Sequence, residues 1–238
     1  MLLHNERLEY LAWDSDLFNK KIGRVFVDKS SDLEEILSNA QRSNYQLIYV
    51  FGSKDFFVEN NILAWFNGCL TDRKVLYEKR VIKAKENPSF ISEYKSNKII
   101  AELELLAYES GKHSRFKLDK NFQENDFYRM YKIWIENSIN KQIADNVFVV
   151  KDNEVVKGFV TLKIDSEKGY IGLIAVSPDV QGKNYGKALI NVCENELLSN
   201  NVFKLEVSTQ ANNIQACKFY EKCNFQIKEI NNIYHFWL

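Results

Sequence analysis

The sequence is poor in proline, glycine, histidine and cysteine, and it has no excess of either charge. Its 238 residues include 2 prolines and 9 glycines. This composition excludes collagen-like and low-complexity chains. Lys plus Arg equals Asp plus Glu at 32 each, so no global field attracts nucleic acid, and any anion site must be local. We therefore expect no nucleic-acid partner.

Long apolar runs are also absent. No segment approaches the roughly 20 apolar residues that span a bilayer, and residues 1–6 lack a basic stretch followed by an apolar core. We predict a cytoplasmic protein without a membrane partner. The cysteines form no C-x-x-C pair, and the scattered histidines form no ligand cluster, so we predict neither a disulfide framework nor a metal site. These residues are Cys69, Cys193, Cys217, Cys223, His4, His113 and His235.

Strand-like and helix-like patterns alternate along the chain, which is 45% hydrophobic. The fold class is therefore α/β, with a sheet flanked by helices. A polar loop separates the two long central helices, and residues 151–154 are predicted to join two strands as a hairpin. The predicted strands are 23–28, 46–51, 75–83, 146–150, 155–164, 170–176, 203–207, 225–229 and 233–238. The predicted helices are 33–40, 60–66 (closed by Gly68), 98–109, 124–140, 184–199 and 213–222.

The strongest local signal lies where the strand 170–176 ends. A turn that contains Pro178 follows, and Gly182 and Gly186 stand where a helix must begin. A helix N-terminus offers unpaired N–H groups and the positive end of its dipole, and glycines let the backbone approach a pyrophosphate. Lys183 and Lys187 would add local positive charge. The spacing is one residue too short for a Walker loop, which would also need Ser or Thr at Ala188.

This segment resembles motif A of the GCN5-related N-acetyltransferases (GNAT), [RQ]-x-x-G-x-[GA]. Gln181 and Gly186 match, and Asn184 replaces the middle glycine; asparagine tolerates left-handed geometry better than most residues. Residues 213–225 resemble motif B, N-x-x-A-x-x-x-Y-x-x-x-G-F, with Asn224 in place of the glycine. The resemblance implies acetyl-CoA as acyl donor, without metal. The residues implied to bind it are Ile174, Ala175, Val176, Gln181, Gly182, Lys183, Asn184, Tyr185, Gly186, Lys187, Asn213, Ala216 and Phe219.

The resemblance also implies how the reaction proceeds. The backbone N–H near Ile174 would meet the thioester carbonyl, beside a bulge that splays the neighbouring strands, and Val176 would pair with the pantetheine amides. Tyr220 would protonate the departing thiolate, since a phenol with a pKa of about 10 stays protonated at neutral pH. Its alternative role is a core aromatic, although Phe219 is the expected core residue of the two. No general base stands out, and the acyl-chain preference stays open.

Three further segments resemble the TDP-fucosamine acetyltransferase-like group. They are residues 8–18, with the opening Trp13-Asp14-Ser15, and residues 111–119 together with 131–138. This resemblance implies acetylation of the 4-amine of a dTDP-linked 4-amino-4,6-dideoxyhexose. The loop 112–119 has a suitable composition, with a charged group for phosphate and hydrogen-bonding and stacking groups beside it. The predicted substrate-binding residues are His113, Ser114, Arg115, Phe116 and Asp119.

Several alternatives stay open. The loop 112–119 could be a solvated basic loop, and Trp134 could be helix core instead of a sugar-stacking wall. The acceptor could be a peptide, a polyamine or an antibiotic amine, or the chain could be a non-catalytic acyl-CoA-binding module. The hydrophobic residues 233–238 fit an inner strand or the edge of a homodimer.

The resemblance finally implies a domain organisation. A GNAT fold has a mixed central sheet flanked by helices, and residues 75–238 would form this acetyltransferase domain. Residues 1–74 repeat the order strand, helix, strand, helix, strand, so they would be a degenerate half-GNAT subdomain without a phosphate loop. Ordinary α/β alternation is the alternative to this duplication.

Overall fold

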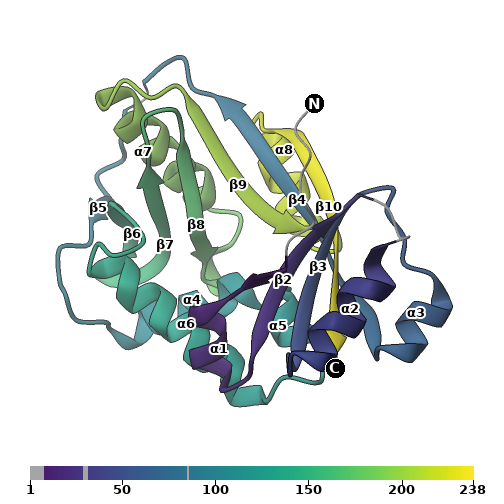
Figure 1. Ribbon diagram of the computed structural model, residues 1–238. Coiled ribbons are helices and arrows are strands. Elements are labelled where there is room, and N and C mark those ends of the chain that lie inside the picture. The colour runs from purple at the N-terminus through teal and green to yellow at the C-terminus, as the bar shows by residue number, and fades with distance from the viewer. Residues whose placement is uncertain (1–7, 29–31, 85) are drawn as a thin grey trace. The chain divides into compact units, whose positions relative to one another are not determined.

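A computed structural model describes residues 8–28, 32–84 and 86–238 (Figure 1). The predictions that concern residues 1–6 and His4 lie outside this range. Helices and strands alternate as the sequence pattern indicates. The strands are β1 Glu9–Tyr10, β2 Ile22–Val27, β3 Leu47–Ser53, β4 Gly68–Arg80, β5 Ile91–Glu93, β6 Asn146–Asp152, β7 Val155–Ile164, β8 Gly169–Val176, β9 Lys204–Gln210 and β10 Gln226–Trp237. The helices are α1 Ala12–Phe18, α2 Leu33–Arg42, α3 Asn60–Trp65, α4 Ala101–Gly111, α5 Arg115–Leu118, α6 Glu124–Ile139, α7 Tyr185–Ser199 and α8 Ile214–Lys222, with a 3₁₀ turn at Pro178–Val180.

The chain forms two compact units, each with its own part of a mixed sheet. Unit 1 comprises the described residues up to Val75 together with Gln210–Asn212 and Glu229–Leu238, and unit 2 comprises Leu76–Thr209 and Asn213–Lys228. The chain thus enters the second unit close to the predicted boundary of 74/75, but Glu229–Leu238, with most of the last strand, belongs to the first unit. Strands β4 and β10 contribute residues to both units. The duplication of a half-GNAT unit stays a prediction.

Unit 1 orders its strands β1-β2-β3-β10-β4. β2 and β3 are parallel, whereas β10 is antiparallel to β3. Residues 233–237 therefore belong to an inner strand and not to a dimer edge. Helix α2 buries Leu33, Leu37 and Ala40 against this sheet, and its acidic first turn and basic last turn complement the helix dipole.

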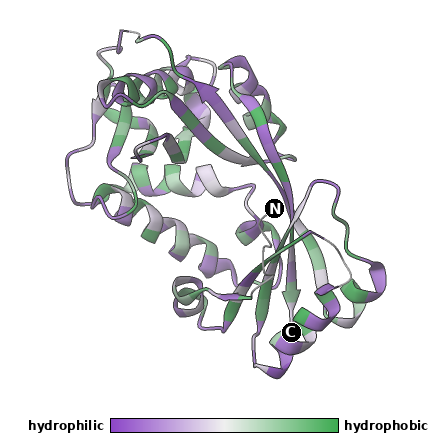
Figure 2. Cartoon of the chain, turned by 45° about the horizontal axis from the view of Figure 1, so that its top comes forward, coloured by the Kyte–Doolittle hydropathy of each residue, from purple (hydrophilic) through white to green (hydrophobic). Residues whose placement is uncertain are grey.

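Unit 2 orders its strands β10-β4-β9-β8-β7-β6-β5. The neighbouring pairs from β5 to β8 are antiparallel, and β8 and β9 are parallel. Helices α4 and α7 both pack against β7 and β8. Cys193 belongs to the core of this unit, because its side chain is fully buried on α7. Figure 2 shows hydrophobic and hydrophilic residues interleaved along the helices and strands, which lets each element bury one face.

The hairpin between β6 and β7 is tighter than predicted. Its turn consists of Asn153 and Glu154 alone, and both have a positive φ, of 50° and 64°. Two consecutive residues with positive φ define a type I′ turn, whose twist suits a two-residue hairpin. The predicted four-residue turn, residues 151–154, was therefore too long by two residues at its start, since Lys151 and Asp152 belong to β6.

The predictions for β4 and β10 were wrong in length. Strand β4 begins at Gly68, which was predicted to end a helix, and it ends at Arg80 before the predicted limit. The helix ends at Trp65 and Asn67 turns the chain with a φ of 47°. A Cβ at Gly68 would lie 2.3 Å from the Phe236 ring, so glycine is needed for close packing. The two predicted C-terminal strands form the single strand β10.

Four elements were not predicted: β1, α1, β5 and α5. Helix α5 replaces part of the predicted polar loop between the long helices. Its single turn forms because Phe116 packs into the core between Phe122 and Trp134, with ring centroids 5.6 and 6.3 Å away. Tertiary packing thus decides its conformation, since one isolated helical turn is not stable in water.

Candidate active site

Strands β8 and β9 pair over three positions only. The register runs from Gly169↔Leu205 to Ile171↔Val207. Over the described residues, β8 then continues to Val176 and β9 to Gln210 without pairing to each other. Parting strands leave backbone N–H and C=O groups unpaired along the facing edges. We call residues 172–176 the open edge of β8.

Hydrogen bonds to β7 define which backbone groups face this open edge. The N–H of Ser177 donates to the Lys157 carbonyl at 2.8 Å, and the N–H of Leu173 donates to Thr161 Oγ1 at 2.8 Å. Successive N–H groups along a strand point to opposite edges. The N–H groups of Ile174 and Val176 therefore point away from β7 to the open edge. These are the two residues to which the family resemblance assigns the thioester carbonyl and the pantetheine.

Ala175 lies differently from its two neighbours. By the same alternation, its N–H points to β7, where Ala175 is in register with Phe159, and its side chain is buried. Of the three strand residues predicted to bind the acyl donor, the structure therefore brings the backbone of two to the open edge.

The open edge leads into residues 177–187, where the sequence predicts a pyrophosphate site. We call this segment the phosphate turn. Gly182 has a φ of 89°, and no atom lies within 4 Å of the position that its Cβ would occupy. Asn184 precedes α7 with a left-handed φ of 63°, which agrees with the expectation for an asparagine in place of glycine. Ala188 N–H bonds to the Asn184 carbonyl. The N–H groups of the preceding helical residues, Tyr185 to Lys187, have no acceptor within the helix and are available to an anion.

The side chains around this turn reduce its positive charge. Lys183 Nζ lies 2.9 Å from Asp152 Oδ2, and the Tyr185 hydroxyl donates to the same oxygen at 3.1 Å. The hydrogen bonds from Lys183 and then Tyr185 lower the pKa of Asp152 below its ordinary range. Lys187 is exposed. The amide of Gln215, on α8, donates to Gln181 at 3.0 Å, which ties the turn to that helix.

Helix α8 carries the predicted proton donor. The Asn213 side chain caps it by accepting from Ala216 N–H at 3.2 Å, so Asn213 has a structural role whatever else it binds. Tyr220 is 4% exposed, and its ring lies 5.6 Å from that of Tyr77 on β4. Burial first, and the nearby thiols of Cys223 and Cys217 after it, raise the pKa of Tyr220 above its ordinary value. A phenol in this site stays protonated.

The expectation that Phe219 is the core residue of the pair was wrong. Tyr220 is buried, whereas Phe219 is half-buried. A Cβ at Gly186 would lie 3.0 Å from the Phe219 ring, so this ring covers the phosphate turn. Sequence reasoning also missed Tyr77, which is buried and donates its hydroxyl to Glu221 Oε1 at 3.1 Å.

The residues predicted to bind the acceptor lie on and around α5. Ser114, Phe116 and Asp119 are buried. Asp119 accepts from the backbone and side-chain nitrogens of Asn121 at 3.0 and 3.1 Å. His113 and Arg115 are partly exposed, and the Arg115 guanidinium carbon lies 4.3 Å from the centre of the Phe116 ring. Phe116 is therefore a core residue that supports Arg115 and not an exposed stacking surface.

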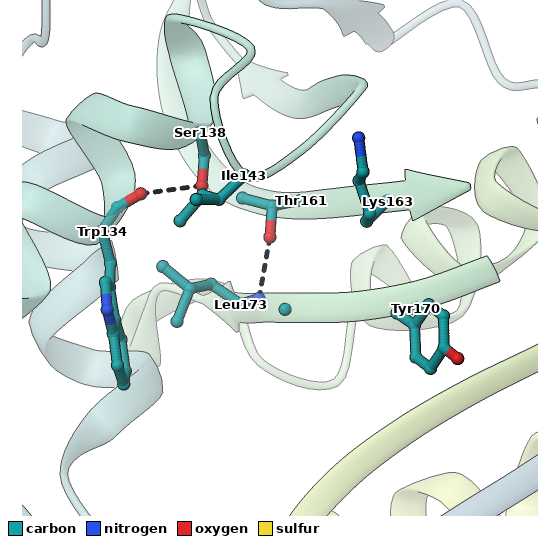
Figure 3. A pocket seen from close by; sticks show the side chains of 8 residues that line it. Trp134, Ser138, Ile143, Thr161, Lys163, Tyr170 and Leu173 are labelled. Atoms are coloured by element: carbon teal, nitrogen blue, oxygen red, sulfur yellow. Dashed lines mark hydrogen bonds between the residues drawn. The ribbon is translucent and has the colours of Figure 1, made fainter. Parts of the chain in front are cut away.

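A pocket of about 270 Å³ adjoins β7 and β8 in unit 2 (Figure 3). Trp134 lies on one wall and Tyr170 on another, so Trp134 lines a cavity as well as contacting the core. The polar side chains of the pocket are already engaged: Ser138 donates to the Trp134 carbonyl at 2.7 Å, and Thr161 accepts from Leu173. Its lining residues are Trp134, Ser138, Ile143, Thr161, Lys163, Tyr170, Gly172 and Leu173.

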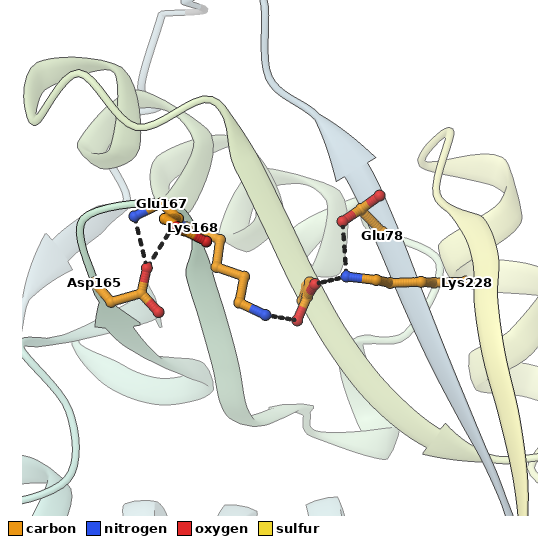
Figure 4. A network of polar contacts seen from close by, with 6 residues as sticks. Glu78, Asp165, Glu167, Lys168 and Lys228 are labelled. Carbon is orange, nitrogen blue, oxygen red and sulfur yellow. Dashed lines mark hydrogen bonds and ion pairs between the residues drawn. The ribbon is translucent and has the colours of Figure 1, made fainter. Parts of the chain in front are cut away.

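A buried carboxylate lies where β8 and β9 are still paired. Glu206, 1% exposed on β9, accepts from Lys168 at 3.1 Å and from Lys228, which also contacts Glu78 (Figure 4). Burial alone would raise the pKa of Glu206, but the hydrogen bonds from both lysines outweigh it and lower that pKa. No sequence signal predicted this network, because a single Glu in a strand is typical of a position that faces solvent.

Within residues 8–28, 32–84 and 86–238, no three His, Cys, Asp or Glu side chains lie close enough to hold a metal ion. No helix in the same part of the chain has the length and apolar character needed to cross a membrane.

An open strand edge that leads to a helix N-terminus suits a thioester and its pyrophosphate, and this places the fold among the acetyl-transferring enzymes. Residues 100–225, more than half of the chain, match the Acetyltransferase (GNAT) family. The chain belongs to this family. The predicted fold and the predicted kind of enzyme are thereby confirmed, and acetyl-CoA is the acyl donor that the GNAT fold uses.

Individual proteins show the same relationship. The chain is similar to the spore coat polysaccharide biosynthesis protein SpsD of Bacillus subtilis (strain 168), with 25% identity over 132 residues, which are 56% of this chain and 45% of SpsD. The match therefore spans less than half of that relative. An acetyltransferase of Yersinia pestis (strain Pestoides F) is 24% identical over 45% of this chain and 86% of its own length. A GCN5-related N-acetyltransferase from Sphaerobacter thermophilus has a similar fold, with a TM-score of 0.59, 13% identity, and coverage of 90% of this chain and 72% of its own.

Proposed function

We propose that the protein transfers the acetyl group of acetyl-CoA to the amine of a nucleotide-linked aminosugar of the dTDP-4-amino-4,6-dideoxyhexose type. The observation that carries the transfer reaction is the open edge of β8. It presents the N–H groups of Ile174 and Val176 next to a turn whose helix begins with unpaired N–H groups at Tyr185 to Lys187. Acetyl-CoA carries its thioester, pantetheine and pyrophosphate in this order. These parts would meet the Ile174 N–H, the Val176 N–H and the helix N-terminus in turn.

The reaction is direct attack. The neutral amine nitrogen forms a bond to the thioester carbonyl carbon, and the N–H of Ile174 stabilises the oxyanion that develops. The carbon–sulfur bond then breaks, and Tyr220 gives its phenolic proton to the thiolate. The nitrogen releases one of its protons to water, and a proton from water restores the phenol of Tyr220. The raised pKa of Tyr220 keeps the proton available up to this step. No enzyme nucleophile is required.

Three observations support a sugar acceptor. SpsD, by its name, acts in polysaccharide biosynthesis, and residues 8–18 and 111–119 resemble enzymes that acetylate dTDP-linked aminosugars. In addition, Arg115 is partly exposed and supported by the buried ring of Phe116, so a planar cation is held ready for a diphosphate. The cytoplasmic location and a homodimer stay predictions from the sequence.

The experiment is a thiol-release assay with acetyl-CoA against nucleotide aminosugars, the matching free aminosugars, polyamines and a peptide amine. We expect the nucleotide sugar to have the highest kcat/KM, because remote binding energy from the nucleotide is used in the transition state. Arg115→Ala should raise KM for the nucleotide sugar by about 10- to 100-fold, as for a lost charge-assisted hydrogen bond, and leave KM for acetyl-CoA unchanged.

Arg42→Ala is the matched control, since Arg42 is exposed in the last turn of α2. Its KM for both substrates should equal that of the wild type. Equal turnover of the free sugar, or a preference for the peptide or polyamine, would overturn the sugar assignment and leave the acetyl transfer. Absence of thiol release with every amine would overturn the transfer itself.

A further inference from the structure

The register between β7 and β8 breaks beside the open edge. Val160 lies opposite Ile174, but Leu162 lies opposite Ile171. One residue of β7, Thr161, therefore faces two residues of β8, Gly172 and Leu173. This is a β-bulge, and it leaves one residue of the bulged strand without its partner in the ladder.

The side chain of Thr161 takes the place of the missing partner. Its Oγ1 accepts the Leu173 N–H at 2.8 Å in the interior, where Thr161 is only 2% exposed (Figure 3). Gly172 is part of the same arrangement, since a Cβ there would lie 2.9 Å from Thr161 Oγ1. A threonine opposite a glycine thus determines where the extra residue of β8 is accommodated.

The bulge stands at the point where β8 leaves β9. Pairing with β9 ends at Ile171, and the bulge follows at the next two residues. The first N–H beyond the bulge that points to the open edge belongs to Ile174. The orientation of the Ile174 N–H therefore depends on the preceding peptide group. The nitrogen of that group belongs to Leu173, and its N–H donates to Thr161 Oγ1.

We propose that Thr161 is a positioning residue for acetyl transfer, which fixes the bulge so that the Ile174 N–H meets the thioester oxygen. This inference rests on the proposed function. Thr161 acts through the β8 backbone and does not touch the acyl donor. Its hydroxyl should therefore matter more for the oxyanion that develops in the reaction than for binding of the ground-state thioester.

A purely structural hydroxyl would behave differently. If Thr161 only satisfied a buried N–H, its loss would destabilise the fold and leave kcat per folded molecule unchanged. The two roles separate when kcat, KM for acetyl-CoA and stability are measured on the same variants.

The experiment compares Thr161→Val, which keeps the shape and removes the acceptor, with Thr161→Ser, which keeps the hydroxyl. Thr161→Val should lower kcat by about 10- to 100-fold, the scale for a displaced catalytic group, with KM for acetyl-CoA nearly unchanged. Thr161→Ser should retain kcat within about 3-fold. The control is Thr71→Val in β4 of unit 1, where the hydroxyl donates to the Ile233 carbonyl at 3.1 Å, and kcat should not change.

Amide exchange at Leu173 and Ile174 gives an independent readout, and both should exchange faster in Thr161→Val than in the wild type and the serine variant. If Thr161→Val does not fold, Gly172→Ala tests the same bulge, because its Cβ meets Thr161 Oγ1, and it too should lower kcat. An active wild type with unchanged kcat in Thr161→Val, or in Gly172→Ala in its place, would overturn the inference. A serine variant as impaired as the valine variant would overturn it as well. An inactive wild type would instead overturn the proposed function.

Discussion

Two parallel strand pairs occupy corresponding places in the two units, and they differ in how far they stay together. In unit 1, β2 and β3 remain in register over all of β2, from Ile22↔Leu47 to Val27↔Gly52. In unit 2, β8 and β9 are in register only from Gly169↔Leu205 to Ile171↔Val207. Each pair is connected by a helix, α2 or α7.

The difference shows that the strand–helix–strand order alone does not create an open strand edge. The paired β2 and β3 leave no free backbone between them, and the connection from residue 28 to 32 contains no glycine. The opening β8 and β9 come with a bulge in β8 and a turn with Gly182 and Gly186. Among the residues that the structure describes, the open edge and the phosphate turn occur together only in unit 2.

The largest effect is expected from the helix that follows the open pair. Tyr220→Phe should lower kcat by about 10²-fold or more, the usual scale for a positioned proton donor, with KM for acetyl-CoA nearly unchanged. The raised pKa of Tyr220 means that the wild type should not lose its acid below about pH 10. Steady-state kinetics from pH 6 to 10 measure both effects. A near-wild-type kcat across this range would show that water is the acid. Unit 2 would then differ from unit 1 in binding the acyl donor and not in carrying a catalytic acid.

A smaller effect is expected at the turn that unit 1 lacks. Gly186→Val should raise the Kd of acetyl-CoA by about 10- to 100-fold through lost contacts with the pyrophosphate. The side chain would meet the Phe219 ring, which lies 3.0 Å from the position of a Cβ. The Kd of Gly186→Ala should lie between those of the wild type and the valine variant, because one methyl group displaces the Phe219 ring less. Equilibrium titration measures this series. A folded valine variant with wild-type affinity would show that the turn is only a structural connection, as between β2 and α2 in unit 1.

The smallest effect is expected at Glu206, where β8 and β9 are still paired. Glu206→Gln should lower the free energy of unfolding by about 1–2 kcal/mol at pH 7, because the hydrogen bonds from Lys168 and Lys228 weaken. The folded pKa of Glu206 lies below the ordinary 4.5, so this stabilisation is complete above pH 4.5 and is lost as pH falls through the folded pKa.

Denaturant unfolding at pH 7 and pH 3 tests this dependence. Glu34→Gln, at an exposed position in the first turn of α2, is the control and should change stability by only a few tenths of a kcal/mol. An equal loss for Glu206→Gln at both pH values would contradict the assignment of the effect to an ionised carboxylate.

The sequence was sufficient for the features that depend on local geometry. The phosphate turn was predicted because Pro178, Gly182 and Gly186 restrict or permit backbone conformations that few residues share. The longer helices followed from their apolar periodicity. The limits of β4 and β10 could not be predicted, since strand length depends on which neighbour is available for pairing.

Other parts of the site depend on contacts that no local pattern contains. Thr161 and Glu206 each occupy an ordinary place in a strand, and their partners come from other strands or from the turn before β8. Neighbouring positions in a helix are only about 100° apart, so periodicity did not decide whether Phe219 or Tyr220 is buried. The single turn of α5 depends on the burial of Phe116.

The place of β10 in unit 1 has a consequence for protein synthesis. β10 lies between β3 and β4 in the strand order, although nearly 150 residues separate β4 from it along the chain. When the ribosome has translated β1 to β4, the hydrogen-bonding edge of β3 that faces β10 still has no partner. The first unit can therefore complete its sheet only after residues 229–238 have left the exit tunnel. The nascent chain must keep an apolar edge from aggregating until then, and the unit that begins first along the chain completes its fold last.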